Sequence, residues 1–428
     1  MGLIVQKYGG TSVGDASRIL RVAERVAAAK LAGNDVVVVV SAMGDSTDEL
    51  LALAGRVSAD PAPRELDMLL TAGERISMSL LAMAIKDRGV TAKSFTGSQA
   101  GIITDTLHGR AKILDVRAGR ISEAISEGHV VIVAGFQGVS TGHDVTTLGR
   151  GGSDTTAVAL AAALGAEVCE IYTDVDGVFT ADPRLVPDAR KLHAVTYEEM
   201  LELAACGARV LMLRCVEYAR RSGVKVHVRS SFTDAQGTWV LEEDERMEKA
   251  IISGVPHDTS EAKVTLVGVP DQPGIAARTM RLIADEAINV DMIVQNVSHE
   301  GTTDISFTVP KADLGRVLRV LEQVKGEVGA RTVLADEEIA KVSLVGAGMK
   351  SSPGVAATMF EALADAGVNI EMISTSTIRV SCVIRAGDVT TAVRAIHDRF
   401  KLSDEAEYRH GHADGTAEIP VIPREVGA

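Results

Sequence analysis

The second half of the chain repeats one short pattern, and the repeat limits the folds that are possible there. The run AKVTLVG at 262–268 recurs as AKVSLVG at 340–346, and PGIAARTMRLIADEAINVDMI at 273–293 recurs as PGVAATMFEALADAGVNIEMI at 353–373. Each copy predicts a strand, a Pro-Gly turn, a helix and a second strand. The repeat therefore predicts two copies of one small α+β domain.

The first half of the chain alternates between continuous apolar runs and segments with helical spacing. The strand-like runs are rich in β-branched residues, and they cover 3–10, 35–44, 129–138, 166–177 and 224–232. Runs without alternation predict strands buried on both faces, as in a parallel sheet. Helices are predicted from residue 15 to Gly33, and over 66–88, 111–127, 154–164 and 197–222. We expect a three-layer α/β sandwich with a mostly parallel sheet, followed by the two α+β units.

The length and a change in composition predict where the domains end. A chain of 428 residues is long enough for two or three domains. The charged run EEDERMEKA at 242–250 favours a linker. We expect a first domain over 1–245, a linker over 246–262, two repeat domains over 263–338 and 339–408, and a polar tail over 409–428.

Composition argues against two classes of partner and for a reducing compartment. The net charge is −14 and there is no basic run, which disfavours nucleic acid; aromatic residues make up only 3%, too few for a base-stacking surface. The four cysteines show no paired or metal-binding spacing, which predicts reduced thiols in the cytoplasm. We find no signal peptide and expect no membrane span.

Four glycine-bearing loops follow strand-like runs, at 7–12, 41–44, 135–138 and 147–154. The carboxyl ends of parallel strands meet at one edge of a sheet, so these loops are expected to gather there. Glycines let backbone N–H groups approach phosphate oxygens closely. The patterns GxxxxGK[ST] and GxGxxG are absent, so each loop taken alone is equally well an ordinary turn.

The fourth loop, TLGRGGSD, combines glycines with charged side chains. Ser153 or Asp154 is predicted to cap the following helix, and Arg150 offers a planar fork for a carboxylate or phosphate. Asp154 can also accept from an ammonium group. Glu74 is either a surface glutamate in a first helical turn or a binding residue. The acidic run at 172–184 lacks the EF-hand spacing and fits a nucleotide loop or solvated turns. No Ser-His-Asp, Cys-His or metal-ligand cluster emerges from the sequence.

Several long motifs resemble aspartate kinase (aspartokinase). They are VQKYGGTSVGD, VVVSAMGDSTDELL, LLTAGERISMSLLAMAI, AGFQGVS, RVLMLRCVEYARRSGVKVHVRSSF and the segment from TTLGRGGSD to TADPR. The resemblance extends to about residue 404. It implies an amino-acid kinase domain followed by tandem ferredoxin-like ACT domains. It also implies transfer of the γ-phosphoryl group of ATP, with Mg²⁺, to the side-chain carboxylate of L-aspartate, at the start of the lysine, threonine, methionine and isoleucine pathway.

The resemblance assigns roles to individual residues. The implied catalytic residues are Lys7, Arg150 and Asp154. The implied ATP contacts are Lys7, Tyr8, Gly9, Gly10, Ser41, Thr173, Asp174, Phe179, Asp182 and Arg184. The implied aspartate contacts are Thr47, Glu74, Arg150, Gly151, Gly152 and Ser153, with Glu74 binding the ammonium group. The implied amino-acid effector contacts are Asp271, Gly274, Ile275, Ala276, Gln295, Asn369, Ile370 and Ser376.

Regulation is the part where this sequence departs from the family. The second repeat reads STSTIRVS where the family usually reads STSEIRIS, so Thr377 replaces an acid at the effector site where lysine binds. The resemblance therefore implies a response to threonine and a weakened response to lysine. The segment 251–255 is expected to add a strand to the second repeat. The alternative is that the repeats only mediate dimerisation.

Subunit composition and two other functions stay open. Met247 is either a linker methionine in a homodimer or an internal start that yields a small subunit and an α2β2 enzyme. A kinase of the same fold with another acceptor, such as acetylglutamate, is disfavoured by Glu74 and the paired repeats. A catalytically silent amino-acid sensor is disfavoured by the intact Lys7, Arg150 and Asp154.

Overall fold

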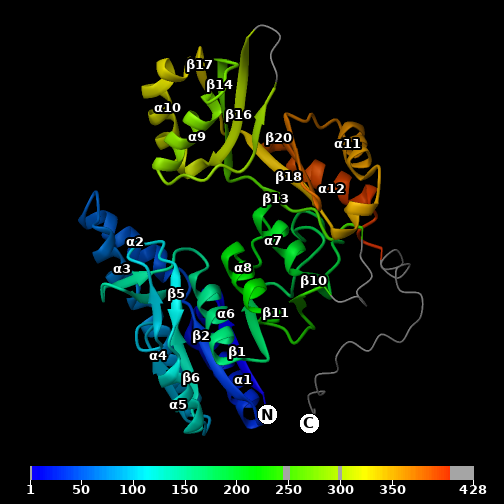
Figure 1. Ribbon diagram of the computed structural model, residues 1–428. Coiled ribbons are helices and arrows are strands. Elements are labelled where there is room, and N and C mark those ends of the chain that lie inside the picture. Colours follow the sequence, from blue (N-terminus) through cyan, green and yellow to red (C-terminus); the bar gives the residue numbers. More distant parts are fainter. Residues whose placement is uncertain (1, 244–250, 297–300, 405–428) are drawn as a thin grey trace. The chain divides into compact units, whose positions relative to one another are not determined.

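The computed structural model describes residues 2–243, 251–296 and 301–404 (Figure 1). These residues form two compact units. The first comprises 1–178, 191–204 and 209–245, and the second comprises 179–190, 205–208 and 246–428. Met247 and the tail at 409–428 lie outside the described residues. Two short segments of the first half, 179–190 and 205–208, cluster with the repeats.

The first unit is built on an eight-stranded sheet in the order β10-β12-β11-β9-β1-β2-β6-β3. Five neighbouring pairs are parallel, from β11 through β9, β1, β2 and β6 to β3, whereas β12 runs antiparallel to β11. The mostly parallel sheet predicted from the apolar runs is therefore confirmed. The strands are β1 (Leu3–Tyr8), β2 (Asp35–Val40), β3 (Ala92–Phe95), β6 (Val130–Ala134), β9 (Val168–Thr173), β10 (Ala194–Thr196), β11 (Val226–Ser230) and β12 (Thr238–Leu241).

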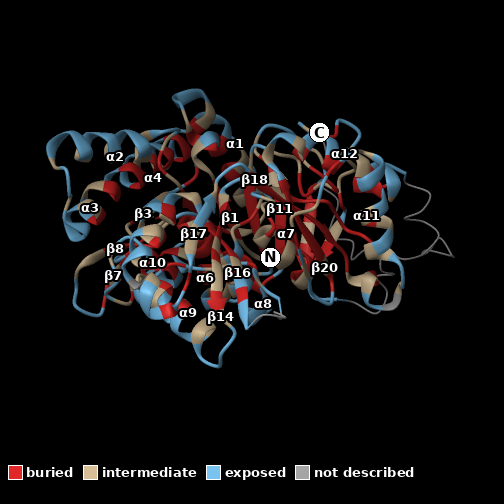
Figure 2. Ribbon diagram, turned by 90° about the horizontal axis from the view of Figure 1, so that it is seen from above, coloured by how far each residue is buried: buried red, intermediate tan, exposed pale blue. Residues whose placement is uncertain are grey.

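Helices cover both faces of this sheet and complete the three layers. On one face, α1 (Ala16–Leu31) and α4 (Ala72–Lys86) pack against every second residue of β2 and β6 in one apolar core. On the other face, α6 (Gly152–Leu164) contacts β1, β2 and β9, and α8 (Leu213–Ser222) packs against α6. Figure 2 shows β1 and β11 buried, whereas α2 (Ser46–Val57) has no buried residue.

Several elements differ from the sequence predictions because contacts distant in sequence decide them. The helix predicted over 66–88 is two helices, α3 (Pro63–Leu70) and α4, and the helix predicted over 197–222 is α7 (Tyr197–Ala205) and α8. The helix predicted over 111–127 is wrong in its first half. There β5 (Ile113–Val116) pairs with β4 (Ile102–Thr104) before α5 (Gly119–Ser126) begins. A small sheet in the order β5-β4-β7-β8, with β7 (Gln137–Ser140) and β8 (Val145–Thr147), was not foreseen.

The stretch 63–86 is the one part of the described chain long and apolar enough to cross a membrane, with a mean hydropathy of 1.4 in its most apolar 18-residue window. Half of its most apolar window is buried inside the protein, and core helices pass the same test. The stretch arises because α3 and α4 follow each other with only Thr71 between them. This differs from the expectation that no run is long enough.

The second unit contains two four-stranded sheets, one for each repeat. The first repeat consists of β14 (Glu261–Pro270), α9 (Ile275–Asp285), β15 (Ile293–Gln295), β16 (Thr302–Pro310), α10 (Leu314–Val328) and β17 (Thr332–Asp336). The second consists of β18 (Ile339–Val345), α11 (Val355–Asp365), β19 (Met372–Thr375), β20 (Arg379–Arg385) and α12 (Val389–Arg399). The segment before the first repeat pairs with β18, through a bridge from Gly254 and through β13 (His257–Asp258).

Reciprocal ion pairs join the two repeats. Lys263 and Lys341 occupy the same position in the two copies, as do Asp291 and Glu371. Lys263 binds Glu371 of the other copy, and Lys341 binds Asp291 of the other copy. Lys341 also lies 3.0 Å from Glu261, and its side chain is only 1% exposed. Burial lowers the pKa of this lysine, but the two carboxylates outweigh that effect and hold it above its usual value.

We predict that the two lysines contribute unequally to stability. Lys341→Met removes the cation and leaves two carboxylates in a largely buried cluster, which should cost about 3–5 kcal/mol of unfolding free energy. Lys263→Met should cost about 1 kcal/mol, because this lysine is 21% exposed against 1% for Lys341, and Arg385 still lies 2.9 Å from Glu371. Urea unfolding of both variants measures the difference. Equal losses would show that burial of the Lys341 cluster does not matter.

Candidate active site

The predicted glycine loops meet at the carboxyl ends of the central strands. Main-chain hydrogen bonds tie them together: Ser41 N donates to Tyr8 O at 3.1 Å, and Gly44 N donates to Gly10 O at 3.0 Å. Gly135 N donates to Val40 O at 3.0 Å. The first three loops gather because β1, β2 and β6 are parallel, so their carboxyl ends share one edge of the sheet. The fourth loop follows β8 of the small sheet, and Leu148 N joins it to the third loop by donating to Phe136 O at 2.9 Å.

A nearly buried ion pair lies at this edge. Lys7 Nζ is 2.6 Å from Asp154 Oδ1, and the two side chains are 11% and 9% exposed. Lys7 comes from β1, and Asp154 comes from the first turn of α6, where the helix dipole favours a carboxylate. A lysine ammonium has three N–H donors, so Lys7 can bind Asp154 and a second anion together. The Lys7 ammonium is therefore held at a fixed position beside the glycine loops, with N–H donors left for a second anion.

Glu74 places a buried carboxylate next to the second loop. Its side chain comes from the first turn of α4, and the residue is 2% exposed. Oε1 accepts from Ala42 N at 3.2 Å, whereas Oε2 is buried and has no hydrogen-bond partner among the described residues. Burial raises the pKa of Glu74 to about 7. The interpretation of Glu74 as a surface glutamate is wrong, and its unpaired oxygen favours a cationic ligand group.

The fourth loop depends on its glycines. Gly149 and Gly151 have φ of 76° and 69°, which disfavours other residues, and a Cβ at Gly151 would lie 1.9 Å from Met212 Cγ. Gly151 is the N-cap of α6, so the prediction that Ser153 or Asp154 caps this helix is wrong. Asp154 binds Lys7 instead. Arg150, between the glycines, is exposed, while Gly152 and Ser153 are buried in the first turn of α6.

The other residues predicted for the site differ in burial, and some of them belong to the second unit. Thr47 is half-buried at the start of α2, and Ser41 is half-buried after β2. The ring of Tyr8 is fully buried and stacks on Tyr172 with 4.7 Å between the ring centroids, so the ring cannot contact a ligand. Thr173 ends β9, with Asp174 exposed after it. Three residues of the acidic run belong to the second unit, namely Phe179, Asp182 and Arg184.

Arg184 pairs with a neighbour in that run. Its guanidinium contacts the Asp182 carboxylate with nitrogen–oxygen distances of 3.0 and 2.7 Å. This pairing lowers the pKa of Asp182. The Asp182 carboxylate therefore stays charged near neutral pH, and the pair presents both charge signs at the surface of the run.

A buried polar network beneath the site was missed by sequence reasoning. Glu170 accepts from Gln6 Nε2 at 2.9 Å and from Tyr172 Oη at 3.1 Å, and it lies 3.1 Å from Arg229 Nη1. These residues come from β1, β9 and β11, and all lie on the sheet face opposite Lys7. The sequence signal that could have revealed this network is a polar residue inside each of three apolar runs, namely Gln6, Glu170 and Arg229. The network holds in register the strands that carry the loops.

The predicted effector residues lie at corresponding places in the two repeats. Gly274 and Gly354 are N-caps of α9 and α11, with φ of 97° and 93°. Asp271, Ile275 and Ala276 flank the first of these glycines. Gln295 ends β15, Asn369 and Ile370 precede β19, and Ser376 and Thr377 follow it. Asp271, Gln295, Asn369, Ser376 and Thr377 are exposed.

Together these residues form an anion site and a cation site on one rigid edge. The Lys7 ammonium, the glycine N–H groups and the start of α6 suit phosphate oxygens. The unpaired oxygen of Glu74 suits an ammonium group. Among the described residues there is no group of three or more His, Cys, Asp or Glu that could hold a metal ion. The arrangement suits electrostatic catalysis of group transfer between two bound substrates.

Family models and sequence relatives identify the same type of protein. Residues 2–230 match the model of the amino acid kinase family, and residues 264–324 and 342–400 each match an ACT domain model. The chain is 62% identical over 412 residues to an aspartokinase of Mycolicibacterium smegmatis, covering 95% of this chain and 98% of the relative. It is 58% identical over 412 residues to an aspartokinase of Corynebacterium glutamicum, with the same coverage.

Solved structures agree with the sequence relatives. Aspartokinase III of E. coli in complex with aspartate and ADP has a TM-score of 0.80 and 27% identity, covering 93% of this chain and 99% of that chain. The complex of the same enzyme with lysine and aspartate has a TM-score of 0.71. Aspartate kinase from Synechocystis is 46% identical, with a TM-score of 0.53, and covers 93% of this chain and 69% of that chain.

Proposed function

The chain belongs to the aspartokinase family, and from this premise we propose that it transfers the γ-phosphoryl group of ATP to the side-chain carboxylate of L-aspartate. The products are 4-aspartyl phosphate and ADP. The observation that carries the proposal is the Lys7–Asp154 pair together with the buried, half-satisfied carboxylate of Glu74, which binds the neighbouring glycine loop at Ala42 N. The E. coli relative has been solved with aspartate and ADP.

Each residue of the edge has a role in this reaction. Lys7 neutralises charge on the transferring phosphoryl group, and Asp154 holds Lys7 in place. Glu74 binds the substrate ammonium, and Arg150 binds the substrate α-carboxylate through its planar fork. The side-chain carboxylate of aspartate is already nucleophilic, so the reaction needs alignment and charge neutralisation rather than a strong base.

The remaining contacts divide between the two substrates. On the nucleotide side we place the main chain of Tyr8, Gly9 and Gly10, with Ser41, Thr173, Asp174, Phe179, Asp182 and Arg184. On the aspartate side we place Thr47, Gly151, Gly152 and Ser153. We propose that Mg²⁺ arrives on the phosphates of ATP, because this ion keeps several waters and binds mainly through substrate phosphates.

The segment 179–190 connects nucleotide binding to regulation in this proposal. It packs with the second repeat: Thr180 Oγ1 lies 2.9 Å from His397 Nε2 of α12, and Val255 N donates to Thr180 O at 2.7 Å. Ala181 and Val186 are part of the apolar core of that repeat. We infer that an amino acid bound to the ACT repeats acts on ATP binding through this segment. The proposed effector residues are Asp271, Gly274, Ile275, Ala276, Gln295, Asn369, Ile370 and Ser376.

Effector choice and assembly follow from the resemblance. We propose threonine as the main effector and a weakened response to lysine, because Thr377 offers no carboxylate to an ammonium group. The enzyme would begin the lysine, threonine, methionine and isoleucine pathway. It would act as a homodimer, or as α2β2 with a subunit starting near Met247. Its four free, buried cysteines support a cytoplasmic location.

We predict that Lys7→Met lowers kcat by roughly 100-fold or more, because it removes charge neutralisation in the transition state. The assay is coupled ADP release with and without L-aspartate, and with acetylglutamate as an alternative acceptor. Lys30→Met is the matched control, since Lys30 forms a 2.9 Å pair with Asp35 that belongs to no glycine loop. It should leave turnover unchanged. Unaltered turnover in Lys7→Met contradicts the proposed mechanism, and ADP release with acetylglutamate alone contradicts the proposed substrate.

We predict that kcat/KM for aspartate falls as the pH drops through about 7. Burial raises the pKa of Glu74 to about 7, so the ligand-free site loses the charge that binds the ammonium group below that pH. In Glu74→Gln this pH dependence should disappear, and the KM for aspartate should rise at high pH. A pH profile of the Gln variant that matches the original enzyme would assign the titration to another group.

We predict that Thr377→Glu strengthens inhibition by lysine at least several-fold, because it supplies the missing partner for an ammonium group. Activity is titrated with lysine and threonine, singly and together. Thr390→Glu adds the same charge at an exposed position on α12 and serves as the control. Complete inhibition of the unmodified enzyme by low lysine would refute the weakened response.

A further inference from the structure

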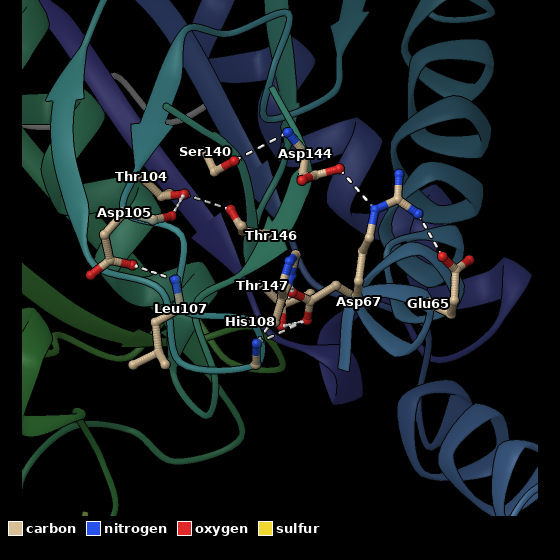
Figure 3. Close-up of polar contacts among 12 residues, drawn as sticks. Glu65, Asp67, Thr104, Asp105, Leu107, His108, Ser140, Asp144, Thr146 and Thr147 are labelled. Carbon is tan, nitrogen blue, oxygen red and sulfur yellow. Dashed lines mark hydrogen bonds and ion pairs between the residues drawn. The ribbon is translucent and has the colours of Figure 1, made fainter. Parts of the chain in front are cut away.

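A buried carboxylate outside the proposed mechanism binds three separate groups. Asp67, on α3, has a side chain that is only 1% exposed. It accepts from Thr147 Oγ1 at 2.5 Å, from His108 Nδ1 at 2.7 Å, and from Gly109 N at 3.1 and 3.2 Å (Figure 3). A carboxylate has enough lone pairs on two oxygens to accept all of these bonds, and no neutral side chain of this size does.

The groups that donate to Asp67 belong to the end of β8, next to Arg150, and to the loop around His108. Thr147 is the last residue of β8, directly before the fourth glycine loop. Ala111 N donates to Thr147 O at 2.9 Å, and a Cβ added to Gly149 would lie 3.1 Å from Gly109 O. The loop around His108 is therefore packed against the glycine loop. Asp67 binds both of them at once.

The carboxylate itself belongs to the part of the chain that carries Glu74. α3 passes through Thr71 into α4, and Glu74 lies in the first turn of α4. Gln137 Nε2 donates to Thr71 O at 3.3 Å and fixes this junction. Asp67 thus bonds the helices that present Glu74 to the loop that presents Arg150, two segments far apart in sequence.

We propose that Asp67 is a positioning residue for aspartate, which sets the distance between Arg150 and Glu74. The proposal rests on the proposed function, in which Arg150 binds the substrate carboxylate and Glu74 binds its ammonium group. A rigid spacing between these two groups selects the length of the amino acid and aligns its side chain. Binding of ATP depends on other loops and should not respond.

The strand β8 offers a matched control for this role. Thr146, the neighbour of Thr147, is also fully buried and forms a 2.6 Å hydroxyl–hydroxyl bond with Thr104. That bond lies within the small sheet and does not reach α3 (Figure 3). Thr146→Val and Thr147→Val therefore remove the same chemical group from the same strand. Only the second breaks the connection to Asp67.

The test measures kcat, the KM for aspartate, the KM for ATP and the urea midpoint of the full-length enzyme. We expect Thr147→Val to raise the KM for aspartate roughly tenfold while the KM for ATP changes little, because a hydrogen bond to a charged group is lost. Thr147→Ser keeps the hydroxyl and should restore the original value. Thr146→Val should lower the urea midpoint without changing either KM.

A second pair of variants covers the case in which Thr147→Val does not fold. His108→Asn keeps an N–H donor near Nδ1 and should bind aspartate normally, whereas His108→Leu should raise its KM. An active enzyme in which Thr147→Val and His108→Leu leave the KM for aspartate unchanged overturns the positioning role alone. Failure of the unmodified enzyme to release ADP with aspartate overturns the proposed function and this role together.

Discussion

The ion pair between Lys7 and Asp154 is the interaction on which the rest of the site depends. It joins the central strand β1 to the first turn of α6, and it is nearly buried, with its atoms 2.6 Å apart. A single charge at this depth would be costly, so each residue of the pair stabilises the other. Because the pair is fixed by a strand and a helix, the positive charge is positioned before any ligand arrives. The glycine loops then supply hydrogen-bond donors around it.

Close backbone approach explains why the loops contain glycine. A Cβ at Gly135 would come 2.8 Å from Ser153 Cβ, and one at Gly10 would come 3.0 Å from Ala42 O. Larger residues would push neighbouring loops apart and displace Lys7 and Glu74 from each other. The same tight packing makes the unpaired oxygen of Glu74 informative. A buried carboxylate oxygen without a partner is expensive, so the fold maintains it at a cost that a bound ammonium group would offset.

The second unit is held together by contacts between two copies of one domain. Lys263 and Lys341 bind acids of the opposite repeat, so the two copies are held together by reciprocal pairs. A segment from the first half of the chain, 179–190, has its core contacts in this unit. Thr180, Ala181 and Val186 of this segment contact the second repeat, so the segment shares its packing.

The sequence by itself determined the parallel sheet, the duplicated domain and the glycine loops, because valine runs, repeats and glycines record local requirements. Residue chemistry already marked Arg150 and Asp154 as candidates and left Glu74 open, and resemblance to a family gave these residues and Lys7 their roles. Only the tertiary structure decided that Glu74 is buried and that Gly151, rather than Ser153, caps α6. It also decided that the predicted helix over 66–88 breaks at Thr71 and that Asp67 joins two distant segments. Periodicity reports which face of an element is buried, but a hydrogen bond between residues 67 and 147 depends on packing that no local pattern encodes.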